Sequence, residues 1–160
     1  MMKCFCPGMT EEEFMNWDMQ ENDWTGKTFY QVKVPMISHF PVAPELKIFR
    51  VMAEIEEKGF RTVAPPLIVF NDGMLVGSLM VEIVSPGGKY ANVVTMGPTR
   101  MISKVYTGPR HLVPKALKEF DRLLMSRKII TNDYYFWFLT CKNCNKRSKE
   151  NKTIIFAKVL

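Results

Sequence analysis

Four cysteines are the residues in this sequence best suited to metal chemistry. Cys141 and Cys144 have the C-x2-C spacing at which two thiolates can bind one zinc ion, with bonds of about 2.3 Å. Cys4 and Cys6 form a shorter C-x-C pair, and nothing in the sequence brings the two pairs together. Three interpretations stay open: a structural zinc site of all four thiolates, a redox dithiol, and reduced thiols that bind nothing.

Glu82 is the only charged residue in the apolar stretch 75–84. A single carboxylate in such a strand lies either on the solvent-facing side or inside a binding site. Val81 and Ile83 face the opposite side of the strand from Glu82, so an exposed Glu82 needs no special explanation. The alternative is that Glu82 supplies a negative charge to a ligand site.

Aromatic side chains are the second group of candidate ligand contacts. Alternation in the run 134–138 places Tyr135 and Trp137 on one face of a strand. Their polar-tipped rings suit a binding wall, and a plain core position fits the pattern equally well. The full candidate set for ligand binding is Glu82 with five aromatic residues, Tyr30, Phe40, Tyr106, Tyr135 and Trp137.

The two histidines give little support to catalysis. His39 and His111 each precede a segment with helical periodicity. A triad would need one of them beside a nucleophile and a carboxylate, and the sequence has no G-x-S-x-G, H-E-x-x-H, P-loop or G-x-G-x-x-G motif. We expect both to be solvated loop residues. No catalytic residue is predicted, and a binding protein is favoured over an enzyme.

The composition is that of a soluble globular domain. The chain has 160 residues, of which 47% are hydrophobic and 24% charged, with a net charge of +6. No apolar run reaches the ~18 residues of a membrane span, and the first residues lack the apolar region of a signal peptide. We therefore expect a cytoplasmic protein without membrane contact, whose thiols form no disulfides.

The positive charge is concentrated in the segments 115–128 and 142–152. Neither segment carries the aromatic motif or the helix-turn-helix spacing of a nucleic-acid-binding module. The sequence therefore favours a solvated basic surface, and a nucleic-acid partner is not expected.

Hydrophobic periodicity predicts the same order of elements twice. An offset of 71 residues aligns the apolar residues of the two helices, placing Leu46 on Leu117 and Phe49 on Phe120. The predicted elements are a strand at 28–34, a helix ending before Gly59 and a hairpin of 67–70 and 75–84, then a strand within 93–106, a helix around 117–124 and a hairpin of 134–139 and 153–159.

These elements predict an α+β fold. Two pseudo-symmetric strand–helix–hairpin repeats, about 28–86 and 91–160, form an antiparallel sheet with two helices on one face. Residues 1–27 are predicted to be an N-terminal appendage with a short helix capped by Thr10. Because seams between repeats are common ligand sites, the seam is the predicted position of a pocket.

Several short segments carry a resemblance to a known family. They are EKGF at 57–60, APP at 64–66, IVFND at 68–72, VYTGP at 105–109 and TIIFAKV at 153–159. With the double strand–helix–hairpin order, they make residues 28–160 resemble the GyrI-like small-molecule-binding domain. That domain is the effector-binding domain of multidrug regulators of the BmrR and AraC types, and the resemblance leads us to expect a stand-alone form of it here.

The resemblance implies an aromatic pocket for flat, often cationic compounds, with an acid on the final strand. The final strand here has no such acid, and the corresponding strand of the first half has Glu82. The resulting hypothesis is a binding protein for a hydrophobic, possibly cationic small molecule. Two alternatives remain: a hydrolase of reactive small molecules that uses Glu82 with Tyr106 or Tyr135, and an inhibitor that binds a protein partner.

Overall fold

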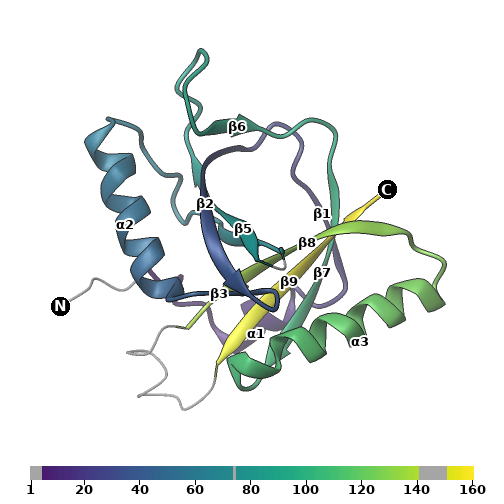
Figure 1. Cartoon of the computed structure of the whole chain (residues 1–160). Coiled ribbons are helices and arrows are strands. Elements are labelled where there is room, and N and C mark those ends of the chain that lie inside the picture. Colours follow the sequence, from purple (N-terminus) through teal and green to yellow (C-terminus); the bar gives the residue numbers. More distant parts are fainter. Residues whose placement is uncertain (1–4, 74, 141–150) are drawn as a thin grey trace. The chain divides into compact units, whose positions relative to one another are not determined.

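The computed structural model describes residues 5–73, 75–140 and 151–160. They form two compact units, one of residues 24–98 and one of residues 5–23 with 99–160. The elements in chain order (Figure 1) are α1 (Glu11–Met15), β1 (Gln20–Asp23), β2 (Thr28–Ile37), β3 (Phe40–Pro41), α2 (Pro44–Glu57), β4 (Ile68–Asn71), β5 (Val76–Ile83), β6 (Val93–Thr95), β7 (Arg100–Thr107), the 3-10 turn η1 (Arg110–Leu112), α3 (Val113–Ser126), β8 (Thr131–Phe138) and β9 (Lys152–Val159).

The sheet of the first unit is built on the hairpin that the sequence predicted. β4 and β5 pair antiparallel on either side of the Asp72-Gly73 connection, and β5 pairs in turn with β2. The other edge of β2 pairs with β6 near its start and with β3 near its end. In this register Tyr30 lies opposite Val81, and Phe29 lies opposite Glu82.

Helix α2 covers one face of this sheet. Val51 and Ile55 are buried on its inner side, and the Tyr30 ring of β2 lies 6.0 Å from the ring of Phe60, just beyond the helix. Gly59 ends the helix in the left-handed region, with φ of 76°. The Phe60 amide then donates to the carbonyl of Ile55, as in a Schellman cap. The predicted glycine terminus is confirmed.

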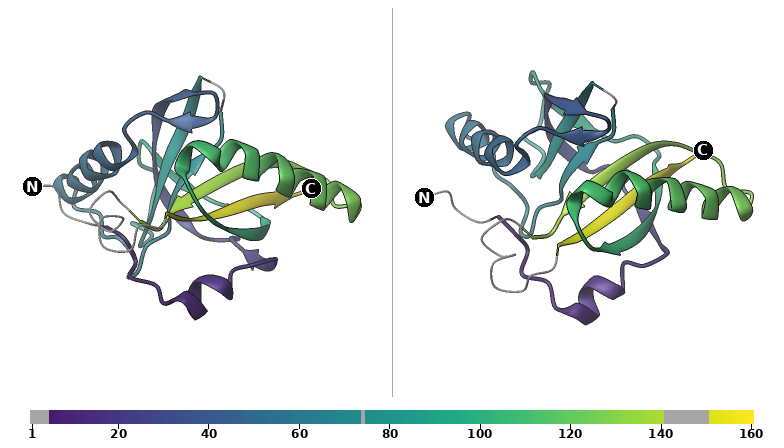
Figure 2. Two further views of the ribbon diagram at one scale, coloured as in Figure 1. Left: turned by 90° about the horizontal axis from the view of Figure 1, so that it is seen from below. Right: turned by 60° about the horizontal axis from the view of Figure 1, so that its bottom comes forward.

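The sheet of the second unit has the order β1, β7, β9, β8, with every pair antiparallel. Helix α3 covers one face, where Phe120 meets Tyr134 edge-on with ring centroids 6.5 Å apart. Trp17, which follows α1, covers the opposite face and lies edge-on to Trp137 at 5.8 Å and to Phe156 at 5.7 Å. Figure 2 shows α1 and α3 on opposite sides of these strands.

The N-terminal segment is joined to the second unit by side-chain and backbone contacts. Thr10 and Glu13 form a complete capping box at α1. Ser103 of β7 donates to the carbonyl of Trp17 at 2.5 Å, and Lys104 pairs with Asp18 at 2.9 Å. The sequence predicted residues 1–27 as an appendage, and in the structure α1 and β1 supply a layer and an edge strand of this unit.

The predicted fold class, α+β with antiparallel strands, is confirmed, but the predicted alignment of the two helices is wrong. Val51 and Ile55 are the buried residues of α2 that correspond to Phe120 and Leu124 of α3, an offset of 69 residues rather than 71. Phe49, which the sequence aligned with Phe120, is 40% exposed. The apolar residues of α2 spread around most of the helix, so the sheet and not the residue type decides which side is buried.

The docking of α1 can be tested on two neighbouring residues. Phe14 is fully buried and Met15 is about half exposed. We expect Phe14→Ala to lower the free energy of unfolding by about 3–5 kcal/mol, because a large cavity replaces the ring. Met15→Ala should change it by less than about 0.5 kcal/mol. Urea denaturation followed by tryptophan fluorescence measures both, and equal effects would show that α1 is not docked.

Candidate functional site

Glu82 is buried and its carboxylate is held at both oxygens. Oε2 accepts a hydrogen bond from Lys27 Nζ at 3.0 Å, and Oε1 accepts one from the backbone amide of Leu67 at 3.3 Å. The Glu82 side chain is only 11% exposed, whereas Lys27 is 32% exposed. The expectation of a solvent-facing Glu82 is therefore wrong.

The segment that precedes β4 pairs with the end of β5 around Glu82. The Val84 amide donates to the carbonyl of Arg61, and the Glu82 amide donates to the carbonyl of Leu67. Thr62 forms an isolated bridge with Ile83. Residues 61–67 thus continue the sheet along the end of β5 and bring the Leu67 amide to the Glu82 carboxylate.

A tight turn places Lys27 and an aromatic pair beside this carboxylate. The Lys27 amide donates to the carbonyl of Trp24 at 3.0 Å, and Gly26 between them has φ of 82°, as a type II turn requires. The turn folds Trp24 back so that its ring lies 5.6 Å from that of Phe29. Both rings are buried. Phe29 shares the face of Glu82 because the two residues are directly opposite each other.

The cluster of Trp24, Lys27, Phe29, Leu67 and Glu82, here called the Glu82 cluster, was only partly visible in the sequence. Glu82 was singled out, and its four partners were not. The Asp72-Gly73 hairpin sets the register of β4 on β5, with Ile68 opposite Val81, and so places Leu67 beside Glu82. That signal could have found Leu67, but neither the register of β2 on β5, which places Phe29 opposite Glu82, nor the turn that brings in Lys27 and Trp24 has a comparable signature.

Tyr30 and Phe40, the other predicted ligand contacts of the first unit, are placed elsewhere. Tyr30 is fully buried on the α2 side of the sheet, the opposite face from Glu82. Its hydroxyl accepts a hydrogen bond from Lys58 Nζ at 2.8 Å, and this bond raises the pKa of Lys58 above its usual value. Phe40 lies in the short strand β3, opposite Ile37.

Tyr106 in the second unit fixes a turn. Its hydroxyl donates to the carbonyl of Pro109 at 2.9 Å. Gly108 lies against it with φ of 152°, and a Cβ at that position would come within 2.7 Å of the hydroxyl oxygen. Burial, and secondarily the charge of Glu119, raises the pKa of Tyr106 above its usual value.

Tyr135 and Trp137 share one face, as the alternation predicted. Register places them opposite Phe156 and Ile154 of β9, and both are buried. This is the face that Trp17 covers, so the two rings lie in the core between the N-terminal segment and the strands. Burial, followed by the charge of Asp133, raises the pKa of Tyr135 to about 12.

The predicted zinc site lies mostly outside the described residues. Cys4, Cys141 and Cys144 are outside, and Cys6 is half-buried. In the part of the chain that the structure describes, no group of three histidine, cysteine or acidic side chains is arranged to hold a metal ion. The zinc hypothesis stays a prediction. Within the same residues, no helix is long and apolar enough to cross a membrane.

A shallow groove of about 350 Å³ lies at the end of α3. Tyr134 donates a hydrogen bond to Asp121 on its wall, and Thr131 lies 2.9 Å from the same Tyr134 hydroxyl. The groove is lined by Asp121, Met125, Lys128, Ile129, Ile130 and Thr131. No residue predicted from the sequence contributes to it.

Comparison with known proteins places the chain by its fold. No curated protein sequence matches it. The C-terminal domain of EcmrR superposes with a TM-score of 0.69 at 12% identity, over 88% of this chain and 96% of that domain. SAV2435 bound to tetraphenylphosphonium superposes with a TM-score of 0.50 at 13% identity, over 88% of this chain and 93% of that one. The chain therefore shares the fold of these two proteins.

The family is defined by a second comparison. A family model described as bacterial hydrolase matches residues 2–159, and the chain belongs to this family. A hydrolase encoded by lin2189 from Listeria innocua superposes with a TM-score of 0.57 at 9% identity, over 94% of this chain and 96% of that one.

The environment of Tyr135 predicts a pH-dependent stability. The folded state binds the phenolic proton more tightly than the unfolded state, whose pKa is the ordinary 10.0, because folding raises this pKa to about 12. The contribution is complete below pH 10 and is lost as the pH rises to 12. We expect denaturation midpoints of wild type to fall over this range relative to Tyr135→Phe. Parallel curves for the two proteins would contradict it.

Proposed function

We propose that the chain binds a hydrophobic organic cation at the Glu82 cluster. The observation that carries this proposal is a buried carboxylate whose charged partner, among the described residues, is a lysine that is 32% exposed. A buried charge needs a partner, but the partner need not belong to the protein. Lys27 is tethered by a flexible side chain and can withdraw into water at little cost.

A ligand cation would replace Lys27 while the backbone continues to hold the carboxylate. The Leu67 amide binds Oε1 and does not depend on Lys27, which binds Oε2. Trp24 and Phe29 are buried beside the carboxylate, and an organic cation that displaces Lys27 would meet aromatic rings there, to which it is attracted. An apolar body and a delocalised positive charge would match the site better than a small hydrated ion. Binding of tetraphenylphosphonium by SAV2435, which has the same fold, is in keeping with this ligand class.

Two substitutions at the Glu82 cluster should change the affinity in opposite directions. Glu82→Gln removes the charge but keeps an acceptor for the Leu67 amide, and should weaken binding of tetraphenylphosphonium about tenfold or more, which is about 1.4 kcal/mol. Lys27→Met removes the competing cation and should tighten binding by a similar factor. Lys27→Met should also lower the melting temperature, because Glu82 is left unpaired, and the ligand should restore it. Tryptophan fluorescence titration and thermal denaturation measure these effects.

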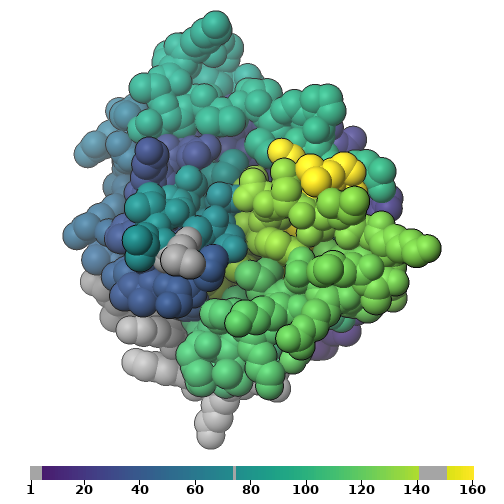
Figure 3. All heavy atoms as spheres, turned by 45° about the vertical axis from the view of Figure 1, so that its right-hand side comes forward, coloured from purple at the N-terminus to yellow at the C-terminus, as the bar shows by residue number. Residues whose placement is uncertain are grey.

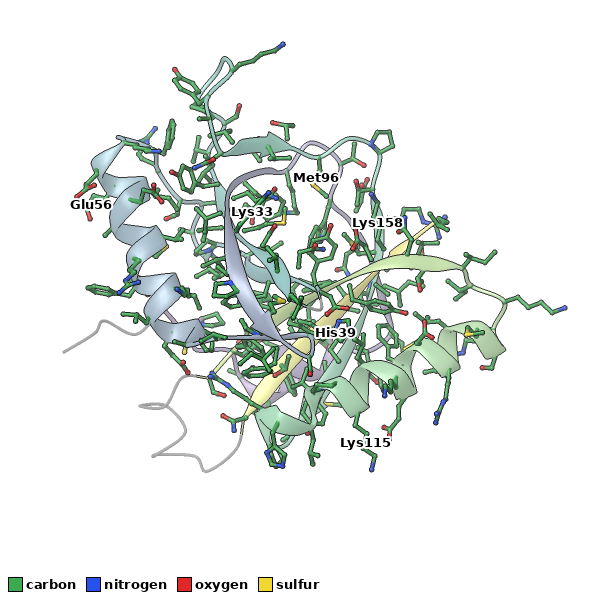
Figure 4. The ribbon with its side chains drawn as sticks, viewed as in Figure 1. Lys33, His39, Glu56, Met96, Lys115 and Lys158 are labelled. Atoms are coloured by element: carbon green, nitrogen blue, oxygen red, sulfur yellow. The ribbon has the colours of Figure 1, made fainter. Side chains whose placement is uncertain are left out.

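Two controls distinguish competition by Lys27 from an effect of net charge on the affinity. Lys33→Met removes the same charge from the exposed part of β2 (Figure 4) without touching Glu82, and should leave the affinity unchanged. Triphenylphosphine oxide, a neutral compound of similar shape, should not distinguish Glu82→Gln from wild type. If Lys27→Met binds the cation no better than wild type does, Lys27 does not compete for the site. If wild type binds no planar or tetrahedral organic cation, the proposed function is wrong.

Membership of the bacterial hydrolase family favours a second function, hydrolysis of a reactive small molecule. Glu82 is poorly placed to be its base, since a water molecule would first have to displace Lys27. The tyrosines considered with it are engaged as well, Tyr106 with the Pro109 carbonyl and Tyr135 within the core. A base for hydrolysis is therefore better sought among other residues.

A further inference from the structure

We propose that His39, oriented by Asp72, is the general base of a hydrolytic site that takes activated esters with a small apolar acyl group. The inference rests on the second proposed function, hydrolysis, and assigns it to a different end of the first unit from Glu82. It is carried by the contact between His39 and Asp72, by the backbone that positions the two residues and by the exposed apolar side chains near them.

The first observation is the pairing of His39 with Asp72. His39 Nδ1 lies 2.7 Å from Asp72 Oδ1, and the Asp72 side chain is 15% exposed against 40% for His39. An ionised carboxylate can only accept a hydrogen bond, so Nδ1 carries the proton when the imidazole is neutral. The lone pair is then on Nε2, at the other side of a ring that reaches solvent. This is the tautomer and support that a histidine base requires.

The second observation is the backbone conformation of the turn. Ser38 and His39 connect β2 to β3, and both have positive φ, 47° and 69°. A two-residue hairpin connection of this kind favours Asn-Gly, because a side chain in the left-handed region is strained. The sequence places serine and histidine there instead. Non-glycine residues held in this region concentrate at functional sites.

The third observation is that a second turn is fixed against the first. The Met36 amide donates to the carbonyl of Leu75 at 2.8 Å. Gly77 allows this approach, since a Cβ there would come within 2.5 Å of the Met36 side chain. The β2–β3 turn and the β4–β5 turn that carries Asp72 therefore lie side by side at the surface (Figure 3), and Figure 4 labels His39 at the first of them.

Exposed apolar side chains surround the pair. Ile37, next but one to His39 in the chain, is 69% exposed, and Leu75 of the second turn is 72% exposed. Val76 is also exposed and lies opposite Pro35 in the register of β2 on β5. An apolar acyl group would find contacts here beside the imidazole. A charged substrate would not be favoured by these side chains, and this is why we infer an ester of a small apolar acid.

The reaction follows from these positions. Nε2 of His39 takes a proton from a water molecule as the water oxygen bonds to the ester carbonyl carbon. The tetrahedral intermediate then collapses, the bond from that carbon to the alcohol oxygen breaks, and the proton on Nε2 passes to the leaving oxygen. The products are a carboxylic acid and an alcohol, and no electron donor or acceptor is needed. Asp72 stabilises the imidazolium that exists between the two proton transfers.

The chain provides its own control, because His111 is the only other histidine. The experiment measures hydrolysis of p-nitrophenyl acetate and butyrate by the full-length protein and three variants. His39→Asn tolerates the left-handed turn but cannot act as the base, and should lower kcat/KM about a hundredfold. Asp72→Asn should lower it about tenfold or more. His111→Gln, a histidine exposed to solvent, should leave it unchanged.

Chemical rescue distinguishes the base from a structural pair. His39→Gly keeps the backbone freedom that the turn requires and opens space for added imidazole, which should restore turnover in a saturable manner. Added imidazole should not accelerate His111→Gln. Thermal denaturation of each variant shows whether it is folded, and a folded His39→Asn with wild-type turnover would overturn the assignment.

Different results would show that His39 is not the base and that the protein is not an esterase. If turnover survives in His39→Asn but is lost in Glu82→Gln, hydrolysis stands and the base is not His39. If the wild-type protein turns over neither ester, both this site and its substrate class are wrong.

Discussion

The pairing of β2 with β5 is the constraint on which the first unit depends. In an antiparallel ladder a residue shares its face with the residue directly opposite, and a shift of one position exchanges the two faces. The observed register puts Tyr30 with Val81 under α2 and Phe29 with Glu82 on the other side. It also sets the far end of the hairpin, where the Met36 amide meets the Leu75 carbonyl. Both candidate sites of this unit therefore follow from one register.

Much of the fold could be predicted because its signals are local. Alternation marks the strands, Asp72-Gly73 marks the hairpin and Gly59 marks the end of α2, where the backbone requires a positive φ. The helix alignment failed for a non-local reason. Several sides of α2 are apolar, and only the sheet determines that Val51 and Ile55 face inward while Phe49 stays exposed.

The candidate sites were predicted less completely than the fold because their partners come from segments without regular periodicity. Glu82 was found as an isolated charge, but its carboxylate is held by the Leu67 amide from the segment before β4, and Lys27 reaches it through a turn at Gly26. Trp17 covers the face of Tyr135 and Trp137 in the same way, from a segment with no periodicity of its own. His39 could not be distinguished from His111 by sequence, since only the meeting of two turns gives one of them an aspartate.

The length of β2 separates the two proposed chemistries. Phe29, beside the Glu82 cluster, and Ile37, beside His39, are at opposite ends of the strand. A strand rises about 3.3 Å per residue, so roughly 26 Å lies between these positions. A ligand of the size of tetraphenylphosphonium cannot occupy both ends at once. A cation at the Glu82 cluster and an ester at His39 would therefore bind without excluding each other, and any influence of one on the other would have to pass through the β2–β5 ladder that joins them.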